Sequence, residues 1–489
     1  MGSENTQSKP RVVVIGAGMA GILSGIRLGE AGLDDYTIYE KAADVGGTWR
    51  ENTYPGIGCD VPSHIYSYSF ELNPDWSRLY SPGDEILRYF RGVAEKYGVL
   101  SSIRFSEEIV RCEFDAGRWH LETSKGRKDE ADFVIAATGV LHHPNLPDIP
   151  GLESFAGDCF HSARWDSSVE IEGKRVGVIG TGSSAVQIVG AATSAVEKMS
   201  LFQRTAQWVA PQLNPLYTDE EKSQFRSNPE TFSEMRNGMA ADYFEQFAKG
   251  LLDANSESMQ NIQDICRQNL EDNVHDSELR ERLRPDYQAA CKRLVVSGDF
   301  YEAIQQPNAE LVTEGIESIE PGGVRTVDGR LHELDVLVLA TGFRVDRFVR
   351  PIDVIGRNGV KLDEKWSQRP SAYLSISIPD VPNFFLLNGP NGPVGNFSLI
   401  EIAEQQFDYV LQLIELKRSG RCNEVCVTQA ALDRFESERT EAAKSTIWNS
   451  GCKSWYLDDR GVPASWPWTF ERFREEMSAP KLEHYELRD

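Results

Sequence analysis

Three absences limit what this chain of 489 residues can be. No uninterrupted apolar run approaches the roughly 18 residues of a membrane-spanning helix. Positive charge is scarce, because 51 Lys and Arg stand against 75 Asp and Glu, which gives a net charge of −24. Such a surface repels nucleic-acid phosphates and anionic lipids, so neither nucleic acid nor a membrane is expected as a partner. The composition predicts a soluble, cytoplasmic globular protein.

The eight cysteines lack the spacing of a metal site or a redox pair. There is no Cys-X-X-Cys motif, and no two cysteines lie five positions apart, as in a flavin disulfide reductase. Cys422 and Cys426 have three residues between them and no histidine cluster nearby. We therefore expect no metal site, and we expect ordinary free thiols in a reducing compartment.

What the sequence does contain is a strand, a glycine turn and a helix, in that order, twice. Residues 11–21 read RVVVIGAGMAG, and residues 175–185 read RVGVIGTGSSA. In this motif the first glycine allows a tight turn, the second lets backbone approach a pyrophosphate, and the third small residue lets the helix pack on the strand. These positions are Gly16, Gly18 and Gly21 in the first copy, and Gly180, Gly182 and Ala185 in the second. Each copy predicts a dinucleotide site at a helix N-terminus.

The residue that closes the second strand of each unit separates the two nucleotides. Glu40 lies 24 residues after Gly16 and can accept hydrogen bonds from a ribose diol. Arg204 lies 24 residues after Gly180, and a guanidinium can hold a 2′-phosphate that a carboxylate would repel. The first unit is therefore predicted to bind FAD and the second NADPH. With no redox cysteine pair, molecular oxygen is the simplest acceptor of the electrons, which favours a monooxygenase.

The fold predicted from this organisation is α/β, with two Rossmann-like dinucleotide-binding domains and a helical insertion. Residues 214–292 are polar, with apolar residues at helical spacing, and are interpreted as the insertion. The FAD-binding domain is assigned to residues 1–140 and 343–489, and the NADPH-binding domain to residues 150–213 and 293–342. A proline-rich stretch at residues 143–150 is the expected hinge.

Two further motifs make the sequence resemble type I Baeyer–Villiger monooxygenases of the class B flavoprotein family. The family signature FxGxxxHxxxW followed by Pro or Asp is matched by Phe155, Gly157, His161, Trp165 and Asp166. The family motif GGxWxxxxYPGxxxD is matched by Gly46, Gly47, Trp49, Tyr54, Pro55, Gly56 and Asp60. The resemblance implies an NADPH- and O2-dependent enzyme that converts a ketone to an ester or lactone through a C4a-peroxyflavin.

The resemblance also implies roles for individual residues. Arg293, oriented by Asp60, is expected to lie over the flavin and to stabilise negative charge on oxygen. Lys292 is expected to join Arg204 and Thr205 at the 2′-phosphate. Trp448 resembles a tryptophan that contacts the nicotinamide cofactor, although the residues after it depart from the family pattern. The remaining implied cofactor contacts are Met19, Gly47, Thr48, Trp49, Tyr66, Val110, Thr181, Ser183, Ser184 and Gln187.

Several alternatives stay open at this level. The related N- and S-oxygenating flavin monooxygenases usually carry Tyr or Phe where Trp165 stands, so sulfoxidation or N-hydroxylation is the main rival activity. An NADPH-binding sensor or an electron-transfer flavoprotein is a rival of another class. His161 and Trp165 could form a hinge or a packed linker. The tail tryptophans, which are Trp448, Trp455, Trp466 and Trp468, could form a lid or pack in the interior. The sequence indicates neither the natural ketone nor the oligomeric state.

Overall fold

The first glycine turn lies in a five-stranded parallel sheet. The computed structural model describes residues 9–393, 395, 397–454, 456–458 and 460–489. The order of this sheet is β19-β7-β1-β2-β3. Its strands are β1 (Val12–Ile15), β2 (Tyr36–Glu40), β3 (Ile103–Phe105), β7 (Phe133–Ala136) and β19 (Phe384–Leu386). The strands β2 and β7 lie on opposite sides of β1, so the strand order reverses at β1. At such a switch point a crevice forms at the carboxyl end of the strand, and ligands commonly bind there.

The second glycine turn lies in another five-stranded parallel sheet with the same arrangement, in the order β13-β10-β9-β17-β8. Its strands are β8 (Asp158–His161), β9 (Arg175–Ile179), β10 (Lys198–Phe202), β13 (Ala309–Val312) and β17 (Val336–Leu339). Here β10 and β17 flank β9, so the carboxyl end of β9 is the second switch point.

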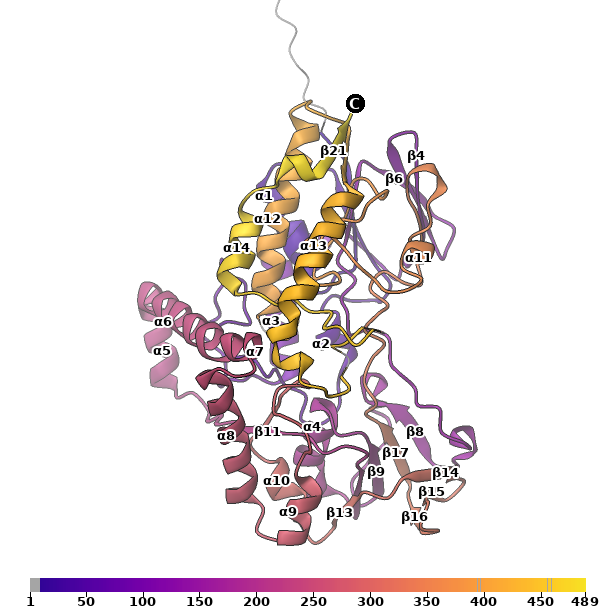
Figure 1. The fold of residues 1–489 in the computed structure, drawn as a ribbon, viewed down its shortest axis with the longest axis vertical. Helices are drawn as coiled ribbons and strands as arrows, with labels where there is room; N and C mark the ends of the chain where they lie inside the picture. Colours follow the sequence, from indigo (N-terminus) through magenta and orange to yellow (C-terminus); the bar gives the residue numbers. More distant parts are fainter. Residues whose placement is uncertain (1–8, 394, 396, 455, 459) are drawn as a thin grey trace, which may run out of the picture.

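Apart from Arg175 at the start of β9, both central strands are apolar, because helices and loops cover the two faces of each sheet. Val12, Val13 and Val14 have no exposed surface, and Val176 and Val178 have none either. A parallel strand buried on both faces reads as a continuous apolar run rather than an alternating one, as these sequences do. In Figure 1 the first sheet lies in the upper half of the molecule and the second in the lower half.

Helices cover the first sheet, and the chain end returns to it. Figure 1 shows α1, α12, α13 and α14 side by side in the upper half. The helices of this half are α1 (Met19–Glu30), α2 (Thr48–Glu51), α3 (Gly83–Lys96), α11 (Leu362–Lys365), α12 (Leu399–Arg418), α13 (Gln429–Ala442) and α14 (Phe470–Ser478). In the other half, α4 (Ser183–Ala192) and α10 (Phe300–Ala303) pack against one another beside the second sheet.

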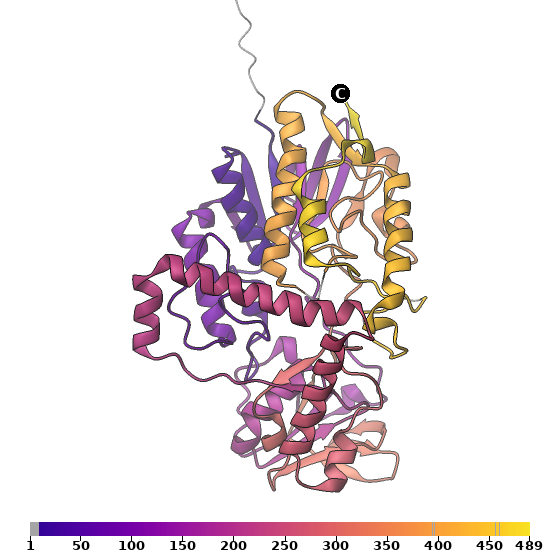
Figure 2. The same cartoon turned by 60° about the vertical axis from the view of Figure 1, so that its left-hand side comes forward.

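The stretch predicted as a helical insertion is helical. Its elements are α5 (Asp219–Ser227), α6 (Pro229–Asp242), a π-helical turn (Tyr243–Ala248), α7 (Lys249–Leu252), α8 (Glu257–Asn273) and α9 (Ser277–Leu283). Local signals explain these starts: Thr218 and Glu221 form a capping box before α5, and Pro229 opens α6. Figure 2 shows the rod from α6 to α7 crossing between the two sheet-bearing halves.

Short sheets complete the fold. A four-stranded sheet joins β18 (Asp353–Ile355), β4 (Ile109–Asp115), β5 (Arg118–Thr123) and β6 (Lys128–Ala131). The others pair β11 (Val209–Pro211) with β12 (Val295–Ser297), β14 (Ile316–Glu320) with β15 (Gly323–Thr326) and β16 (Leu331–Glu333), and β20 (Glu424–Val427) with β21 (Tyr485–Arg488). No helix in the described part of the chain could span a membrane. The predicted two-domain α/β fold is confirmed, whereas the residue bounds of the domains stay a prediction.

Candidate nucleotide-binding and catalytic site

The first glycine turn leaves no room for side chains. Gly16 has a φ of +101°, and a Cβ there would lie 2.6 Å from the carbonyl oxygen of Ala137. A Cβ on Gly21 would lie 1.8 Å from the carbonyl oxygen of Gly16. Gly18 faces Gly47, whose φ is +51° and whose Cβ would come within 3.0 Å of the Gly18 Cα. These positions require glycine, and they bring bare backbone to the N-terminus of α1.

The helices that follow the two glycine turns begin without a capping side chain. Gly18 and Gly182 are the N-cap residues of α1 and α4, and neither first turn contains an acidic residue. By contrast, a Ser, Thr or Asp side chain caps each of α5, α8, α9, α13 and α14. N–H groups left unpaired at a helix start, with no carboxylate beside them, favour an anion such as a pyrophosphate. This observation fits a dinucleotide at both turns.

Glu40 lies where the sequence predicted it, at the end of β2 beside the first turn. Its Oε2 accepts a hydrogen bond from the backbone N–H of Ala17 at 2.8 Å, and its Oε1 accepts one from Ala42 at 2.9 Å. Arg50 Nη1 lies 3.4 Å from Oε1. The carboxylate is therefore fixed at the turn, and Glu40 is buried, with 4% of its surface exposed.

The other residues predicted to contact the first cofactor lie around this turn. Thr48 and Trp49 begin α2 directly after Gly47, and Met19 begins α1. The indole N–H of Trp49 donates to the Tyr66 hydroxyl at 3.2 Å, and the two rings pack edge to face. Val110 lies on β4, a strand that starts beside Glu40 because the N–H of Glu107 donates to the Glu40 carbonyl at 3.0 Å.

The second glycine turn repeats the geometry of the first. Gly180 has a φ of +119°, and a Cβ there would lie 2.3 Å from the carbonyl oxygen of Ala340. A Cβ on Gly182 would meet no atom within 4 Å, so open space lies in front of α4. The Thr181 hydroxyl donates to the Thr205 carbonyl at 2.7 Å, which joins the turn to the loop after β10. Ser183, Ser184, Ala185 and Gln187 follow in α4.

Two cations lie close together beside this second turn. Arg204 is exposed in the loop after β10. Burial lowers the pKa of Lys292, and after partial compensation by Asp286 the charge of Arg204 lowers it further. The Lys292 ammonium lies 4.4 Å from the centre of the Tyr287 ring. A lysine whose charged form is disfavoured by burial and by a neighbouring guanidinium is suited to a ligand with a doubly charged phosphate.

Asp60 and Arg293, which are 233 positions apart in the sequence, form an ion pair with an Nη2···Oδ2 distance of 2.6 Å. The attraction of Asp60 raises the pKa of Arg293 and outweighs the opposing effect of burial. The Arg293 side chain is 38% exposed and that of Asp60 is 22% exposed, so a ligand can reach the pair. The electrostatic neighbours of the pair include Tyr66, Tyr243 and Tyr456. A fixed cation that a ligand can reach can stabilise a developing oxyanion.

Sequence reasoning missed a contact that joins the two halves through Tyr54. Its hydroxyl donates to Gln187 Oε1 at 2.9 Å and accepts from the Ser184 hydroxyl at 3.1 Å. The side-chain amide of Gln187 donates to the Gly58 carbonyl at 3.0 Å. Gly56 has a φ of +80°, and a Cβ there would lie 2.5 Å from the Gln187 carbonyl oxygen. The loop of the YPG motif is therefore packed on α4, next to the second turn.

The expectation of free thiols is wrong for two of the eight cysteines. Cys291 and Cys452 form a disulfide across a sequence separation of 161 residues, with a Cα–Cα distance of 6.2 Å. The fold brings them together, so no spacing in the sequence could indicate the pair. Cys59, Cys112, Cys159, Cys266, Cys422 and Cys426 are free. The disulfide attaches the C-terminal segment to the loop before β12, which carries Lys292 and Arg293.

The tail tryptophans that the structure describes pack in the interior. Trp448 is 1% exposed, and its ring centre lies 5.4 Å from that of Tyr456. Trp466 has no exposed surface and packs against Trp468 at 4.8 Å. Trp455 lies outside the described residues. Whether Trp448 contacts a nicotinamide stays a prediction.

His161, the last residue of β8, is held by hydrogen bonds at both ring nitrogens. Its Nδ1 accepts from the N–H of Ala163 at 3.1 Å, and its Nε2 donates to the Gly342 carbonyl at 3.0 Å. Trp165 packs edge to face on Phe160. Both ring nitrogens of His161 are used, which favours a packed joint and argues against a general base.

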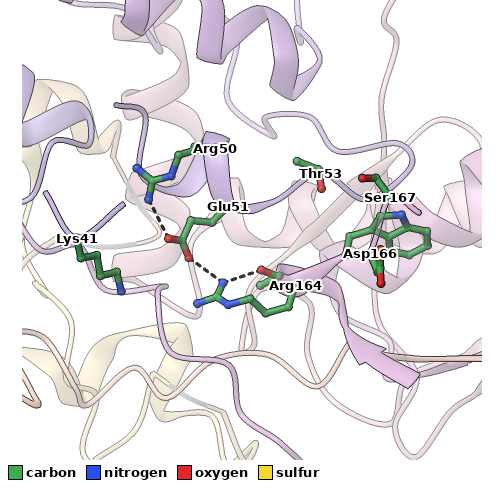
Figure 3. A pocket seen from close by; sticks show the side chains of 9 residues that line it. Lys41, Arg50, Glu51, Thr53, Arg164, Asp166 and Ser167 are labelled. Atoms are coloured by element: carbon green, nitrogen blue, oxygen red, sulfur yellow. Dashed lines mark hydrogen bonds and ion pairs between the residues drawn. The ribbon is translucent and has the colours of Figure 1, made fainter. Parts of the chain in front are cut away.

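A pocket of about 580 Å³ opens between residues 163–167, which follow β8, and residues 41–53 of the first half. Figure 3 shows Glu51 between two guanidinium groups, with Arg50 at 2.9 Å and Arg164 at 2.7 Å. Although burial alone raises the pKa of Glu51, the two arginines lower it overall. Lys41, which follows Glu40, also lines the pocket, so its wall is cationic.

Comparison with known proteins places this geometry among flavoenzymes. A family model of flavin-binding monooxygenase-like proteins matches residues 9–215. A Baeyer–Villiger monooxygenase from Streptomyces coelicolor is 37% identical over 99% of this chain and 94% of its own length. An uncharacterised monooxygenase from Mycobacterium tuberculosis is 46% identical over 98% of this chain and 96% of its own length. The structure of an oxidised steroid monooxygenase bound to NADP superposes with a TM-score of 0.88 at 30% identity, covering 98% of this chain and 99% of that one. The chain therefore belongs to the Baeyer–Villiger monooxygenase family of flavin-binding monooxygenases.

Proposed function

We propose that this protein is an FAD- and NADPH-dependent Baeyer–Villiger monooxygenase that inserts one atom of O2 next to a ketone carbonyl and releases an ester or lactone. The observation that carries the proposal is the partly buried Arg293–Asp60 ion pair, which joins loops from the two sheet-bearing halves. An electron-transfer flavoprotein or an NADPH sensor has no need of such a cation. N- or S-oxygenation is not favoured, because the named relatives at 35–37% identity are Baeyer–Villiger enzymes.

FAD is proposed to bind along the first turn, in the domain formed by residues 1–140 and 343–489. The uncapped N-terminus of α1 would hold the pyrophosphate, and Glu40 would accept hydrogen bonds from the ribose. Arg50, which lines the pocket together with Lys41, also lies 3.4 Å from Glu40, and this pocket would take the adenosine end. The other proposed FAD contacts are Gly16, Gly18, Met19, Gly21, Gly47, Thr48, Trp49, Asp60, Tyr66 and Val110.

NADPH is proposed to bind along the second turn, in the domain formed by residues 150–213 and 293–342, with residues 214–292 as the insertion. The open space in front of Gly182 would admit the pyrophosphate, and Arg204 and Lys292 would hold the 2′-phosphate. The other proposed contacts are Gly180, Thr181, Ser183, Ser184, Ala185, Gln187, Thr205, Arg293 and Trp448.

When bound, the reduced flavin supplies the two electrons that activate O2. The task of the chain is then to stabilise negative charge on oxygen near the ketone. Arg293 keeps its positive charge because Asp60 raises its pKa, and the hydrogen bond from Arg293 to Asp60 fixes one edge of the guanidinium. Asp60 thereby orients the cation without itself contacting the substrate oxygen. The remaining N–H groups of the guanidinium can point to the reacting atoms.

The substrate is a small molecule, and we propose that it is a ketone. We also propose a cytoplasmic location, since the charge of −24 gives no polybasic surface for membranes. The oligomeric state is not part of the proposal.

The proposal is tested with purified protein, added FAD, NADPH and ¹⁸O2. A panel of linear, cyclic, aromatic and steroidal ketones is offered, and products are analysed by mass spectrometry. We expect a yellow protein and, from at least one ketone, an ester that carries one ¹⁸O atom. A thioether is included to measure sulfoxidation in the same assay. A colourless protein that takes up no FAD, or NADPH consumption that yields only peroxide with every ketone, would contradict the proposal.

A further inference from the structure

Tyr456 lies beside Arg293 in the C-terminal segment, although the two residues are 163 positions apart (456 − 293). The side chain is 3% exposed, and its hydroxyl lies close enough to the Arg293 guanidinium for the two groups to interact, which partly offsets the effect of burial on the Tyr456 pKa. On another side the hydroxyl touches the loop at Gly395, where a Cβ would lie 2.1 Å from the oxygen. The ring packs on Trp448. Tyr456 is thus enclosed by the catalytic cation, a neighbouring loop and the interior.

On the N-terminal side of Tyr456, the disulfide anchors the segment that carries this tyrosine. Cys452 is bonded to Cys291, which lies two positions before Arg293. Ala290 adopts a φ of +64°, a conformation that non-glycine residues seldom occupy, and this turn directs the chain into Cys291. The covalent bond therefore holds the backbone that carries the phenol close to the backbone that carries the guanidinium.

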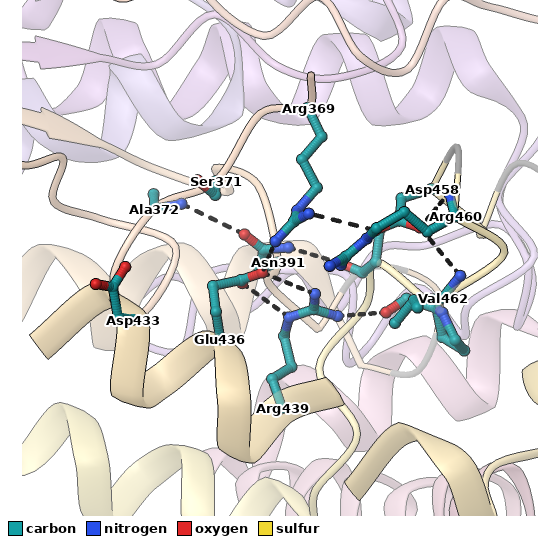
Figure 4. A network of polar contacts seen from close by, with 12 residues as sticks. Arg369, Ser371, Ala372, Asn391, Asp433, Glu436, Arg439, Asp458, Arg460 and Val462 are labelled. Atoms are coloured by element: carbon teal, nitrogen blue, oxygen red, sulfur yellow. Dashed lines mark hydrogen bonds and ion pairs between the residues drawn. The ribbon is translucent and has the colours of Figure 1, made fainter. Parts of the chain in front are cut away.

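On the C-terminal side of Tyr456, a polar network anchors the same segment, as Figure 4 shows. The carboxylate of Asp458 accepts hydrogen bonds from the N–H groups of Arg460 at 2.9 Å and Val462 at 3.0 Å, which closes a tight loop. Arg439 has no exposed surface, and its guanidinium donates to the carbonyl of Pro463.

Neighbouring groups connect this network to the rest of the protein. Glu436 binds Arg439 at 3.0 Å and Arg369 at 2.9 Å, and Arg369 also lies 3.8 Å from Asp458. The side-chain amide of Asn391 donates to the Ala464 carbonyl at 3.4 Å. A buried arginine that donates to a loop carbonyl fixes that loop, because leaving the charged group unpaired would be costly. Anchors on both sides give Tyr456 little freedom to move away from Arg293.

We propose that Tyr456 is a positioning residue for Arg293, holding the guanidinium from a second side so that its free N–H groups point to the reacting oxygen. The inference rests on the proposed function, since it concerns the same cation. A guanidinium carries five N–H donors in one plane, and a single carboxylate leaves the plane free to turn. A second acceptor on a fixed segment restricts that rotation. Burial raises the pKa of Tyr456, so the phenol keeps its proton and adds no negative charge beside Asp60.

The test compares Tyr456→Phe with wild type and with Tyr485→Phe. Tyr485 is a matched control, because it is also buried and its hydroxyl bonds to Tyr409 and Ser377, away from Arg293. The first measurement is ester and peroxide formed per NADPH with one accepted ketone. For Tyr456→Phe we expect kcat for ester to fall by about tenfold, the loss of one hydrogen bond to a charged group. Peroxide should rise in proportion. The KM for ketone should change by less than about twofold, because the substitution should not alter how tightly the ketone binds before it reacts.

The second measurement needs no cofactor and no activity. Apoprotein is treated with phenylglyoxal, and modification of Arg293 is followed by peptide mass spectrometry. A guanidinium released from one of its two acceptors should react at least about threefold faster in Tyr456→Phe, whereas Tyr485→Phe should match wild type. An unchanged ester-to-peroxide ratio, or an unchanged rate of Arg293 modification, overturns the inference. A wild-type protein that makes no ester at all would instead overturn the proposed function, while the modification rates would still decide the role of Tyr456.

Discussion

At the residue scale, the charge of Arg293 should matter more to the reaction than any contact it makes with the protein. Arg293→Ala removes the cation and leaves the partly buried Asp60 carboxylate unpaired. We expect ester formation to fall by at least about 10²–10³-fold, as for other lost oxyanion donors, with hydrogen peroxide released instead. Asp60→Ala should give a milder loss, since the arginine keeps its charge but loses its anchor. The measurement is ester and peroxide per NADPH consumed.

The controls for that experiment are FAD content and the rate of flavin reduction by NADPH, which should both stay near wild type. If Arg293→Ala still makes ester at near wild-type yield, another cation serves the reaction. Arg293→Lys should recover only part of the loss, because an ammonium keeps the charge but cannot bond Asp60 and Tyr456 in one plane.

A second prediction at this scale concerns the choice between the two nicotinamide cofactors. Arg204 is exposed beside the second turn, and Thr181 joins that turn to the loop in which Arg204 lies. Arg204→Ala should raise the KM for NADPH by about tenfold or more, the loss of a charge-assisted hydrogen bond to phosphate. The KM for NADH should change little, because NADH has no 2′-phosphate. Equal losses with both cofactors would mean that Arg204 supports the fold instead.

A third prediction follows from the lowered pKa of Lys292. Burial lowers this pKa, Asp286 partly offsets it, and the like charge of Arg204 lowers it again. Lys292 therefore loses its proton at a lower pH than an ordinary lysine, and affinity for NADPH should weaken as the pH rises through that pKa. In Arg204→Ala the repulsion is gone, so the midpoint of the weakening should move to higher pH. Titrations of NADPH across the alkaline range, with NADH as the control ligand, measure the shift.

At the scale of elements, the packing of α1 on its own turn can be tested with two glycines of the same helix. A Cβ on Gly21 would lie 1.8 Å from the Gly16 carbonyl oxygen, whereas a Cβ on Gly29 would meet nothing within 4 Å. Gly21→Ala must displace the turn, so we expect loss of FAD and a destabilisation of at least about 1–3 kcal/mol. Gly29→Ala should keep FAD and stabilise the protein by up to about 1 kcal/mol, because alanine favours helix. Thermal unfolding and flavin absorbance are the measurements, and similar effects of both changes would refute the packing argument.

The elements that could be predicted are those whose signals are local. An apolar strand, a glycine turn and a small residue at the helix start lie within eleven consecutive positions, and both copies form a strand and a helix, β1 with α1 and β9 with α4. Glu40 was placed by its spacing from Gly16, and its carboxylate is hydrogen-bonded at that turn. The family could be predicted because its motifs are similarly contiguous, and that prediction is confirmed.

What sequence could not supply are pairings between distant residues. Tyr54 meets Gln187 across 133 positions, and Cys291 meets Cys452 across 161. Neither pairing leaves a spacing or a composition signal, since each depends on how the two sheets and the C-terminal segment pack. Tyr456 was missed for the same reason, as nothing near it in the chain shows that Arg293 is its neighbour.

At the scale of the whole molecule, the disulfide makes a direct chemical prediction. Protein denatured without reductant should show six free thiols with a thiol reagent, and eight after reduction. Reduction should also lower the free energy of unfolding by about 2–4 kcal/mol, the usual contribution of a bond that closes a long loop. Cys452→Ser is the matched variant, and it should be insensitive to reductant. Eight thiols before reduction would show that the bond does not form in the purified protein.

The same bond turns residues 291–452 into a covalent ring that contains β12 to β20 and α10 to α13. A protease that cleaves once between those two cysteines would open the ring without releasing a fragment. The nicked protein would migrate as one species on a non-reducing gel and as two after reductant is added. A single cut outside the ring, for instance in the helices α5 to α9, would give two separate fragments with or without reductant. The gel therefore shows whether a cleaved surface loop lies inside or outside the ring.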